Sequence, residues 1–267
     1  MKRTSAIGLA RWLGIISGCL ALVPGHAQAQ VALPRPMGCA EFKPPAGMLE
    51  AVYPLPNVAR ALGTGSKIKI LTIGATTVNS RGPNRDYSLL IENYLETTVK
   101  GLDVEVVDRS VSGELAARSA ERIKFEVALN EPSLVLWQVG TFDAMAQIPI
   151  HEFKTTLTKT IHWLRKHNAD LVMIGLHYQR GLRNNGSYQS FRKIIEQTTA
   201  EEQVLRVGRY EAEELVDRIQ ATMASPIDKF QINENGHDCL SQVIVRAMAT
   251  SLFAKRAPDQ TLPQPRP

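Results

Sequence analysis

The sequence alternates between short apolar runs and longer amphipathic stretches. Five runs rich in Val, Ile and Leu have the length of buried strands: residues 67–74, 103–110, 132–140, 169–175 and 203–208. Apolar residues at helical spacing fill much of the rest, at residues 86–101, 113–129, 151–167, 188–202, 211–223 and 234–253. Apolar strands that each lead into a helix are typical of a parallel sheet with both faces covered. The pattern therefore predicts an α/β fold, a three-layer α/β/α sandwich around a central parallel sheet of about five strands.

Ligands of such sheets bind at the carboxyl ends of the strands. The turns after Gly74, Ser110, Gly140 and Gly175 are therefore the expected places for functional side chains. None of these turns has the glycine pattern of a dinucleotide fold or the lysine of a phosphate loop, so we expect no nucleotide cofactor. A polar loop at residues 180–188 is expected over the same strand ends, either to grip a sugar or an acid or simply as a solvated loop.

The first 29 residues have the order of a secretory signal. Basic residues come first, an apolar stretch follows from about Trp12 to Val23, and small residues lead up to Ala29. The apolar stretch is shorter than the roughly 20 residues that a membrane span needs. We predict cleavage near Ala29 and a periplasmic or secreted protein without a stable membrane span. The alternative is a lipoprotein signal that leaves a lipid on Cys19.

The remaining chain divides into three parts. Residues 30–66 begin with a stretch that carries six prolines between Val31 and Pro56, which predicts an extended N-terminal arm. Residues 67–254 carry the alternating pattern and predict one folded domain. Residues 255–267 are proline-rich without apolar periodicity, which predicts a disordered tail.

Charge and cysteine content narrow the functional classes. Removal of residues 1–29 removes three basic residues and no acidic ones, so the formal charge falls from +5 to +2. No long basic stripe with interleaved aromatic residues remains, so we expect no nucleic-acid partner. Cys39 and Cys239 survive export and would either form a disulfide in an oxidising compartment or stay as two buried thiols. No zinc-ligand spacing is present, and we expect no metal.

Four stretches resemble, in order, the four sequence blocks of the SGNH/GDSL hydrolase family. They are LTIGATT at 71–77, VVDRSVSGELA at 106–116, LVLWQVGTFDA at 134–144 and DKFQINENGHDCL at 228–240. The similarity is greatest to the exported bacterial branch of the family. It implies the α/β/α fold and the chemistry of an esterase or lipase, with a serine nucleophile, a histidine base and an aspartate that orients the histidine. It also implies an oxyanion hole built from backbone N–H groups and an asparagine side chain.

The resemblance places the catalytic positions on residues that mostly differ from the family pattern. The nucleophile position falls on Thr76, the glycine on Gly113, the asparagine on Phe142, the aspartate on Asp228 and the histidine on Gln231. The oxyanion-hole positions are accordingly Thr76, Gly113 and Phe142. Only the glycine and the aspartate are retained.

Each replacement has a chemical consequence. Thr76 keeps a hydroxyl group, but its extra methyl group stiffens the side chain and crowds the line of attack. Phe142 offers no hydrogen bond to an oxyanion, and the loss of one such donor typically lowers the rate by about 10²–10³-fold. Gln231 cannot take up a proton near neutral pH. The usual esterase mechanism is therefore not expected.

Two histidines are candidates for a substitute base. His177 follows the fourth strand, and His237 lies six residues beyond Gln231. The alternative is that His177 orders a loop and His237 lies on a partly exposed helix face. Asp143 is either a displaced acid or a helix cap.

Two functions remain open. In the first, the protein binds a small-molecule or saccharide ligand, or an envelope protein, in the cleft where the hydrolase family has its active site. In the second, it is a divergent esterase or acyltransferase that acts on acyl esters of a cell-envelope substrate such as an acylated saccharide. We prefer the first, because the site lacks the inherited chemistry. A Gln231 side chain turned away from Thr76, with Phe142 in the oxyanion pocket, would favour binding. A histidine within reach of Thr76 would favour the enzyme.

Overall fold

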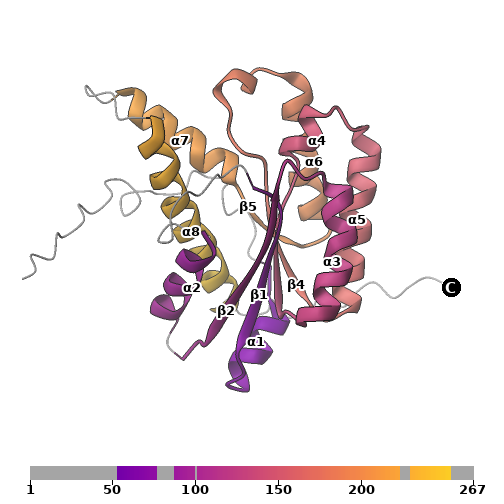
Figure 1. The fold of residues 1–267 in the computed structure, drawn as a ribbon, viewed down its shortest axis with the longest axis vertical. Helices are drawn as coiled ribbons and strands as arrows, with labels where there is room; N and C mark the ends of the chain where they lie inside the picture. Colours follow the sequence, from indigo (N-terminus) through magenta and orange to yellow (C-terminus); the bar gives the residue numbers. More distant parts are fainter. Residues whose placement is uncertain (1–52, 77–86, 100, 223–228, 254–267) are drawn as a thin grey trace, which may run out of the picture. The chain divides into compact units, whose positions relative to one another are not determined.

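A computed structural model describes residues 53–76, 87–99, 101–222 and 229–253. Five strands form one parallel sheet in the order β2-β1-β3-β4-β5 (Figure 1). The strands are β1 Ile68–Thr76, β2 Val104–Ser112, β3 Leu134–Gln138, β4 Asp170–Ile174 and β5 Leu205–Val207. Every paired strand runs in the same direction as its neighbour, which confirms the predicted parallel sheet.

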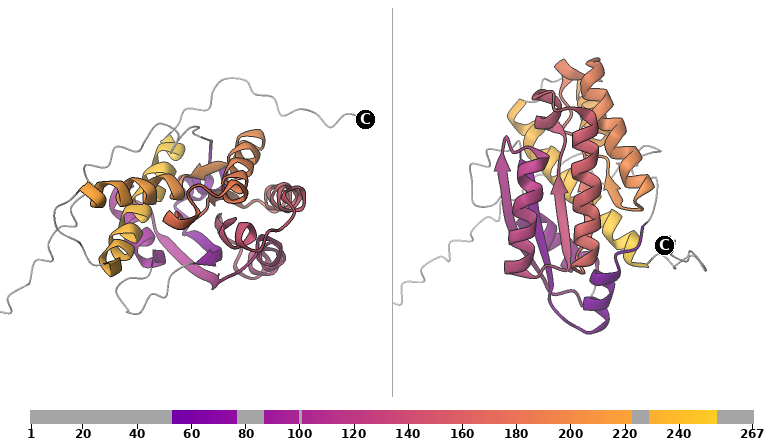
Figure 2. Two further views of the ribbon diagram at one scale, coloured as in Figure 1. Left: turned by 90° about the horizontal axis from the view of Figure 1, so that it is seen from above. Right: turned by 90° about the vertical axis from the view of Figure 1, so that its right-hand side faces the viewer.

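Helices cover both faces of the sheet, as the three-layer prediction requires. They are α1 Pro56–Gly63, α2 Tyr87–Thr98, α3 Ala116–Asn130, α4 Thr141–Met145, α5 Ile150–Lys166, the 3₁₀ turn η1 Arg180–Leu182, α6 Gly186–Glu201, α7 Arg209–Thr222 and α8 Lys229–Phe253. Helices α3, α5 and α6 lie side by side on one face (Figure 2), and α1, α2, α7 and α8 contribute to the core on the other.

The alternation of side chains along each strand produces two separate cores. In β3, Val135 and Trp137 belong to the core under α3, α5 and α6, whereas Leu134 and Leu136 belong to the opposite core. Successive side chains of a strand point to opposite faces, so a strand buried on both faces must be apolar throughout. The indole Nε1 of Trp137 donates to Ser119 Oγ at 2.8 Å, which satisfies the polar atom of this buried ring.

Helix α1 lies within the segment that the sequence predicts to be an extended arm. Its residues Val58 and the preceding Leu55 are buried in the core, so the folded domain begins before Lys67. The Asp170 carboxylate, at the start of β4, accepts from the backbone N–H groups of Asn57 at 2.8 Å and Val58 at 2.9 Å. This cap comes from a residue 113 positions away and is not visible in the local sequence, where only Pro56 at the first helical position indicates a helix start.

The largest further differences from the predicted elements are at α4 and α8. The short helix α4 begins three residues after the end of β3, where the sequence predicts a turn, and α8 begins at Lys229 rather than Glu234. Residues 1–52 and 254–267, which contain the predicted signal, most of the arm and the tail, lie outside the described residues. Within the described ranges, no helix is both long enough and apolar enough to cross a membrane.

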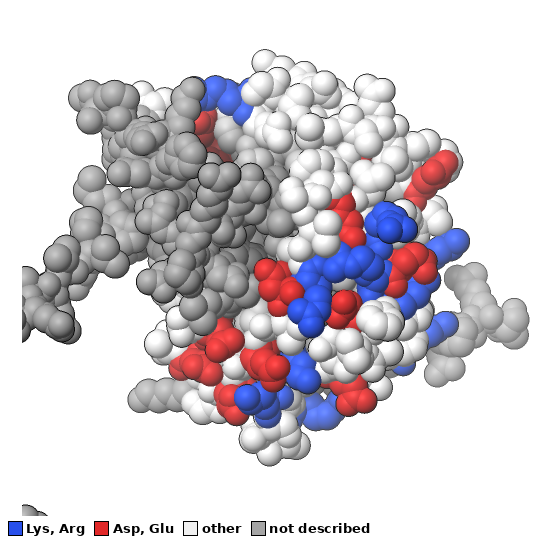
Figure 3. All heavy atoms as spheres, in the orientation of Figure 1, with Lys and Arg blue, Asp and Glu red and all other residues white. Residues whose placement is uncertain are grey.

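Charged side chains of both signs are interspersed on the face shown in Figure 3. Two salt bridges link α3 to the edge strand β2 and to the turn between them. Arg109 of β2 pairs with Glu126 at 3.2 Å, and Arg122 pairs with Glu114 at 2.7 Å. Arg122 also donates to the backbone carbonyl of Arg109, so that α3 is held against the strand at several points.

Candidate functional site

The strand register brings the backbone of the predicted oxyanion-hole positions to one edge of the sheet. Thr76, the last residue of β1, is in register with Ser112, the last residue of β2, and Gly113 follows directly. Phe142 is the second residue of α4, which begins three residues after β3 on the other side of β1. The three positions therefore follow three adjacent strands at their carboxyl ends.

A glycine allows the close approach of β1 and β3 just before this edge. Gly74 has a φ of +103°, and a Cβ atom there would lie 2.2 Å from the backbone oxygen of Gln138. No other residue fits this position without moving a strand. Gly113 also has a positive φ, +79°, but it has open space around it, so glycine is favoured there only by the backbone conformation.

Asp143 is a helix cap rather than a displaced acid. Its carboxylate accepts from the backbone N–H of Ala116 at 2.9 Å and from that of Gly140 at 3.3 Å, so that it caps both α3 and α4. Burial raises the pKa of this carboxyl group, although the backbone hydrogen bonds oppose the shift. Phe142, next to it, is partly exposed and contributes no polar group.

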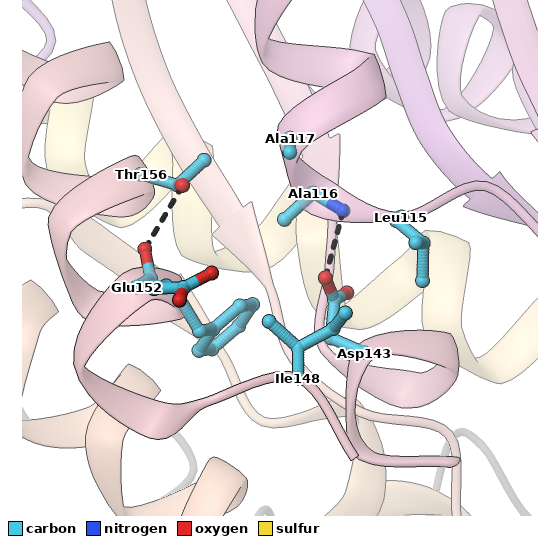
Figure 4. A pocket seen from close by; sticks show the side chains of 8 residues that line it. Leu115, Ala116, Ala117, Asp143, Ile148, Glu152 and Thr156 are labelled. Carbon is cyan, nitrogen blue, oxygen red and sulfur yellow. Dashed lines mark hydrogen bonds between the residues drawn. The ribbon is translucent and has the colours of Figure 1, made fainter. Parts of the chain in front are cut away.

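A small pocket lies beside this cap, between the first turns of α3 and α5 (Figure 4). Its volume is about 100 Å³, enough for a few non-hydrogen atoms. The residues that line it are Leu115, Ala116, Ala117, Asp143, Ile148, Glu152, Phe153 and Thr156. Because both Asp143 oxygens bind backbone N–H groups, the walls offer mainly apolar contact.

The backbone of His177 is fixed from two sides. It lies three residues after β4, its N–H donates to Thr141 Oγ1 at 2.9 Å, and its carbonyl accepts from the hydroxyl of Tyr188. Burial raises the pKa of Tyr188 to about 12, against a hydrogen bond from Thr141 that lowers it. Tyr188 therefore keeps its proton near neutral pH and remains a donor to this carbonyl.

The imidazole of His177 faces a carboxylate that sequence reasoning missed. Nδ1 lies 2.7 Å from Glu213 Oε2, at ion-pair distance but without the geometry of a regular hydrogen bond. Glu213 also accepts from the backbone N–H of Tyr178 at 2.7 Å and from Arg209 Nε at 2.8 Å. Arg209 is buried and donates in turn to Gln138 Oε1, at the end of β3, at 3.1 Å.

The charge of Glu213 is set by these neighbours. Burial alone would raise its pKa, but Arg209 and then His177 outweigh burial and hold the pKa at about 2. Glu213 is therefore ionised at neutral pH. Arg209 and Glu213 are four residues apart on α7, but the helix predicted from the sequence begins only at residue 211, and their approach to His177 depends on how α7 packs.

Helix α7 also holds the loop expected over the strand ends. Asp217 accepts from the Tyr178 hydroxyl and from Arg180 Nε, each at 3.2 Å, and Glu214 lies 3.4 Å from Arg183. Burial, followed by the nearby Asp217, raises the pKa of Tyr178. This end of the loop at residues 180–188 is thus attached to the protein by ion pairs.

The remaining predicted site residues cannot be placed by their side chains. Gln231, His237 and Cys239 all belong to α8, but their side chains, like that of Thr76, lie outside the described part of the structure. Asp228 and Cys39 lie outside the described residues altogether. The triad geometry and the disulfide therefore stay predictions. Among the described residues, no group of three His, Cys, Asp or Glu side chains could hold a metal ion.

The sequence matches the non-GDSL lipase-like family over residues 41–253. The chain belongs to this family. No functionally curated protein matches the sequence. The family match agrees with the resemblance to SGNH/GDSL-type hydrolases, and it covers all the predicted site residues except Cys39.

Solved structures of several hydrolases share the fold at low sequence identity. LAE5, an α/β hydrolase enzyme from the metagenome of Lake Arreo, aligns with a TM-score of 0.58 and 15% identity over 69% of this chain and 97% of its own. A candidate GDSL-like lipase from Parabacteroides merdae gives 0.57 and 14% over 68% and 96%. Axe2, an acetylxylan esterase from Geobacillus stearothermophilus, gives 0.56 and 16% over 71% and 97%. At such identities the likeness establishes the shared fold.

Proposed function

We propose that this protein binds a ligand or an envelope partner at the carboxyl ends of its strands, and that the inherited ester hydrolysis is impaired. The observation that carries the proposal is the glutamine at the base position. Gln231 cannot accept the proton of a hydroxyl nucleophile, and an unactivated threonine is a weak nucleophile.

The rest of the site supports binding in a different way. Gly74 and Gly113 keep the backbone geometry of the strand ends, although the side chains for the reaction are replaced. Phe142 adds an apolar, partly exposed surface where the family pattern has a hydrogen-bond donor. A surface with an aromatic side chain and exposed backbone is suited to contact with a ligand rather than to stabilisation of an oxyanion.

An acetylated oligosaccharide is the first ligand to test. One structure with the same fold is that of an acetyl-xylooligosaccharide esterase, and an acylated saccharide is an ester that the strand ends of this fold can accommodate. We further propose that the chain is exported to the periplasm or secreted, on the basis of the signal-like residues 1–29.

The test measures turnover and binding on the same protein. The rate of 4-nitrophenyl acetate hydrolysis is measured for the protein without residues 1–29 and for its Thr76→Ala variant. We expect the two rates to be equal. Thr97→Ala, at an exposed threonine of α2, is the matched control. Acetylated xylo-oligosaccharides should nevertheless shift backbone amide resonances of the strand ends. The alternative, a divergent esterase with Thr76 as nucleophile, would be established by turnover that disappears in Thr76→Ala and persists in the control.

A restored variant tests the physical reason for the impairment. The triple change Thr76→Ser, Phe142→Asn and Gln231→His returns the nucleophile, the oxyanion donor and the base together. Because such groups act as a unit, we expect each single change to have little effect and the triple change to raise turnover by about 10²-fold or more. If the triple variant is no faster than the parent protein, the backbone geometry of the site must also differ from that of an active hydrolase.

A further inference from the structure

The strand ends hold a second acid–base pair, distinct from the inherited triad positions. His177 follows β4, and Glu213 lies on α7, with Nδ1 of the first 2.7 Å from Oε2 of the second. An ionised carboxylate beside Nδ1 favours the tautomer that carries its proton there, and leaves Nε2 free to accept a proton.

The exposed part of the imidazole is the side that would react. Atom Nδ1 is fully buried, yet 24% of the His177 side chain is exposed. The exposed surface therefore belongs to the other side-chain atoms, which include Nε2. Within the described residues, no hydrogen bond or ion pair engages Nε2.

Both members of the pair are held in place before any ligand arrives. The N–H and carbonyl of His177 are bound by Thr141 and Tyr188, and Glu213 is bound by Tyr178 N–H and Arg209. Such rigid support is what an orienting carboxylate and a proton-accepting imidazole require, because misplacement lowers the rate steeply.

We propose that His177, oriented by Glu213, is a general base that activates water for slow ester hydrolysis at the strand ends. Nε2 takes a proton from the water molecule as the water oxygen forms a bond to the acyl carbon. The tetrahedral intermediate then expels the alkoxide, which takes the proton back from the imidazolium. The products are an acid and an alcohol, and no covalent intermediate forms on the protein.

The position of β4 in the sheet fits this route. Strand β3 separates β4 from β1, so the two strands lie about 10 Å apart, or two strand spacings. The route therefore requires the acyl group to be held on the β3 side of Thr76, so that a single water molecule can lie between its carbonyl carbon and Nε2. The reaction does not pass through the inherited nucleophile, so it goes beyond the binding function proposed above.

The test is hydrolysis of 4-nitrophenyl acetate by the protein without residues 1–29 and by point variants. We expect His177→Ala to lower turnover by about 10²-fold, because general-base catalysis typically contributes that much or more. Glu213→Gln should lower it by about ten-fold or more through loss of orientation. Added imidazole should restore turnover to His177→Ala, a rescue that a purely structural role would not give.

A second histidine–glutamate pair supplies the control. His162 Nε2 lies 2.9 Å from Glu202 Oε2 on the outer surface of α5 and α6, and its side chain is more exposed than that of His177. His162→Ala should leave turnover unchanged, which excludes general reactivity of surface imidazoles. Unfolding temperatures of all variants establish that each is folded.

The outcomes separate the two proposals. Loss of turnover in His177→Ala with rescue by imidazole supports the water route. Full turnover in His177→Ala, or no turnover above background in the parent protein, overturns the water route and leaves the binding function standing. Loss of turnover in Thr76→Ala without dependence on His177 overturns both.

Discussion

Replacement of Arg209 by methionine tests how the charges at the strand ends are balanced. Arg209 is 4% exposed and donates to both Glu213 and Gln138. Methionine has a similar length and no charge, so Arg209→Met removes the guanidinium with little change of volume. In the variant the Glu213 carboxylate is still buried, and it keeps only the neighbouring His177 and the backbone N–H of Tyr178 to offset the cost of burial.

The size of the effect follows from the pKa of Glu213. Its ordinary value is 4.5 and its value in the folded protein is about 2, which is equivalent to about 3 kcal/mol of stabilisation of the ionised form. A lowered pKa gives stability that is fully present above pH 4.5 and is lost as the pH falls through 2. Without Arg209, burial should raise the pKa of Glu213 above its ordinary value. Protonation of Glu213 should therefore reduce the destabilisation of the variant as the pH falls.

Urea unfolding followed by circular dichroism measures this prediction. We expect Arg209→Met to lower the free energy of unfolding by about 3 kcal/mol or more at pH 7 and by clearly less at pH 4. Arg218→Met, at an exposed position of the same helix, should change it by less than about 0.5 kcal/mol. A deficit of Arg209→Met that is the same at both pH values, or that grows towards pH 4, would refute the electrostatic account.

Two further perturbations test the frame around the site. Gly74→Ala should lower the free energy of unfolding by about 3 kcal/mol or more, since its Cβ would lie 2.2 Å from the Gln138 oxygen at a φ of +103°, whereas Gly181→Ala, with nothing within 4 Å, should be tolerated. Thermal unfolding compares the two alanine variants directly. Burial raises the pKa of Asp170 from 3.8 to about 6, so its contribution to stability is fully present below pH 3.8 and is lost as the pH rises through 6. The stability of the parent protein relative to Asp170→Asn should therefore fall by about 3 kcal/mol between pH 3.8 and 7, in the opposite direction to the Glu213 effect. A difference in unfolding free energy between the two proteins that does not change with pH in urea titrations would contradict this prediction.

The sequence by itself determined the layered fold, because burial imposes a local and periodic pattern. The run Leu134–Gln138 is apolar at nearly every position because both of its faces are covered, and the α5 residues Phe153, Leu157, Ile161 and Leu164 recur at helical spacing because one face is buried. Gly113 and Phe142 likewise follow two strands that the apolar pattern predicts. Such features depend on neighbours within one or two turns, which the sequence displays directly.

Only the tertiary structure decided the interactions between distant segments. Helix α1 depends on Asp170, a residue that the sequence offers only as the start of a strand. The pair of His177 and Glu213 exists because α7 packs its first turns against the loop after β4, where Arg209 also reaches the end of β3. Hydrophobic periodicity determines which face of each element is buried, but it does not encode which polar side chains of two packed elements meet. That choice is made by the packing of the elements, and it is what brings His177, Arg209 and Glu213 together at the carboxyl ends of the strands.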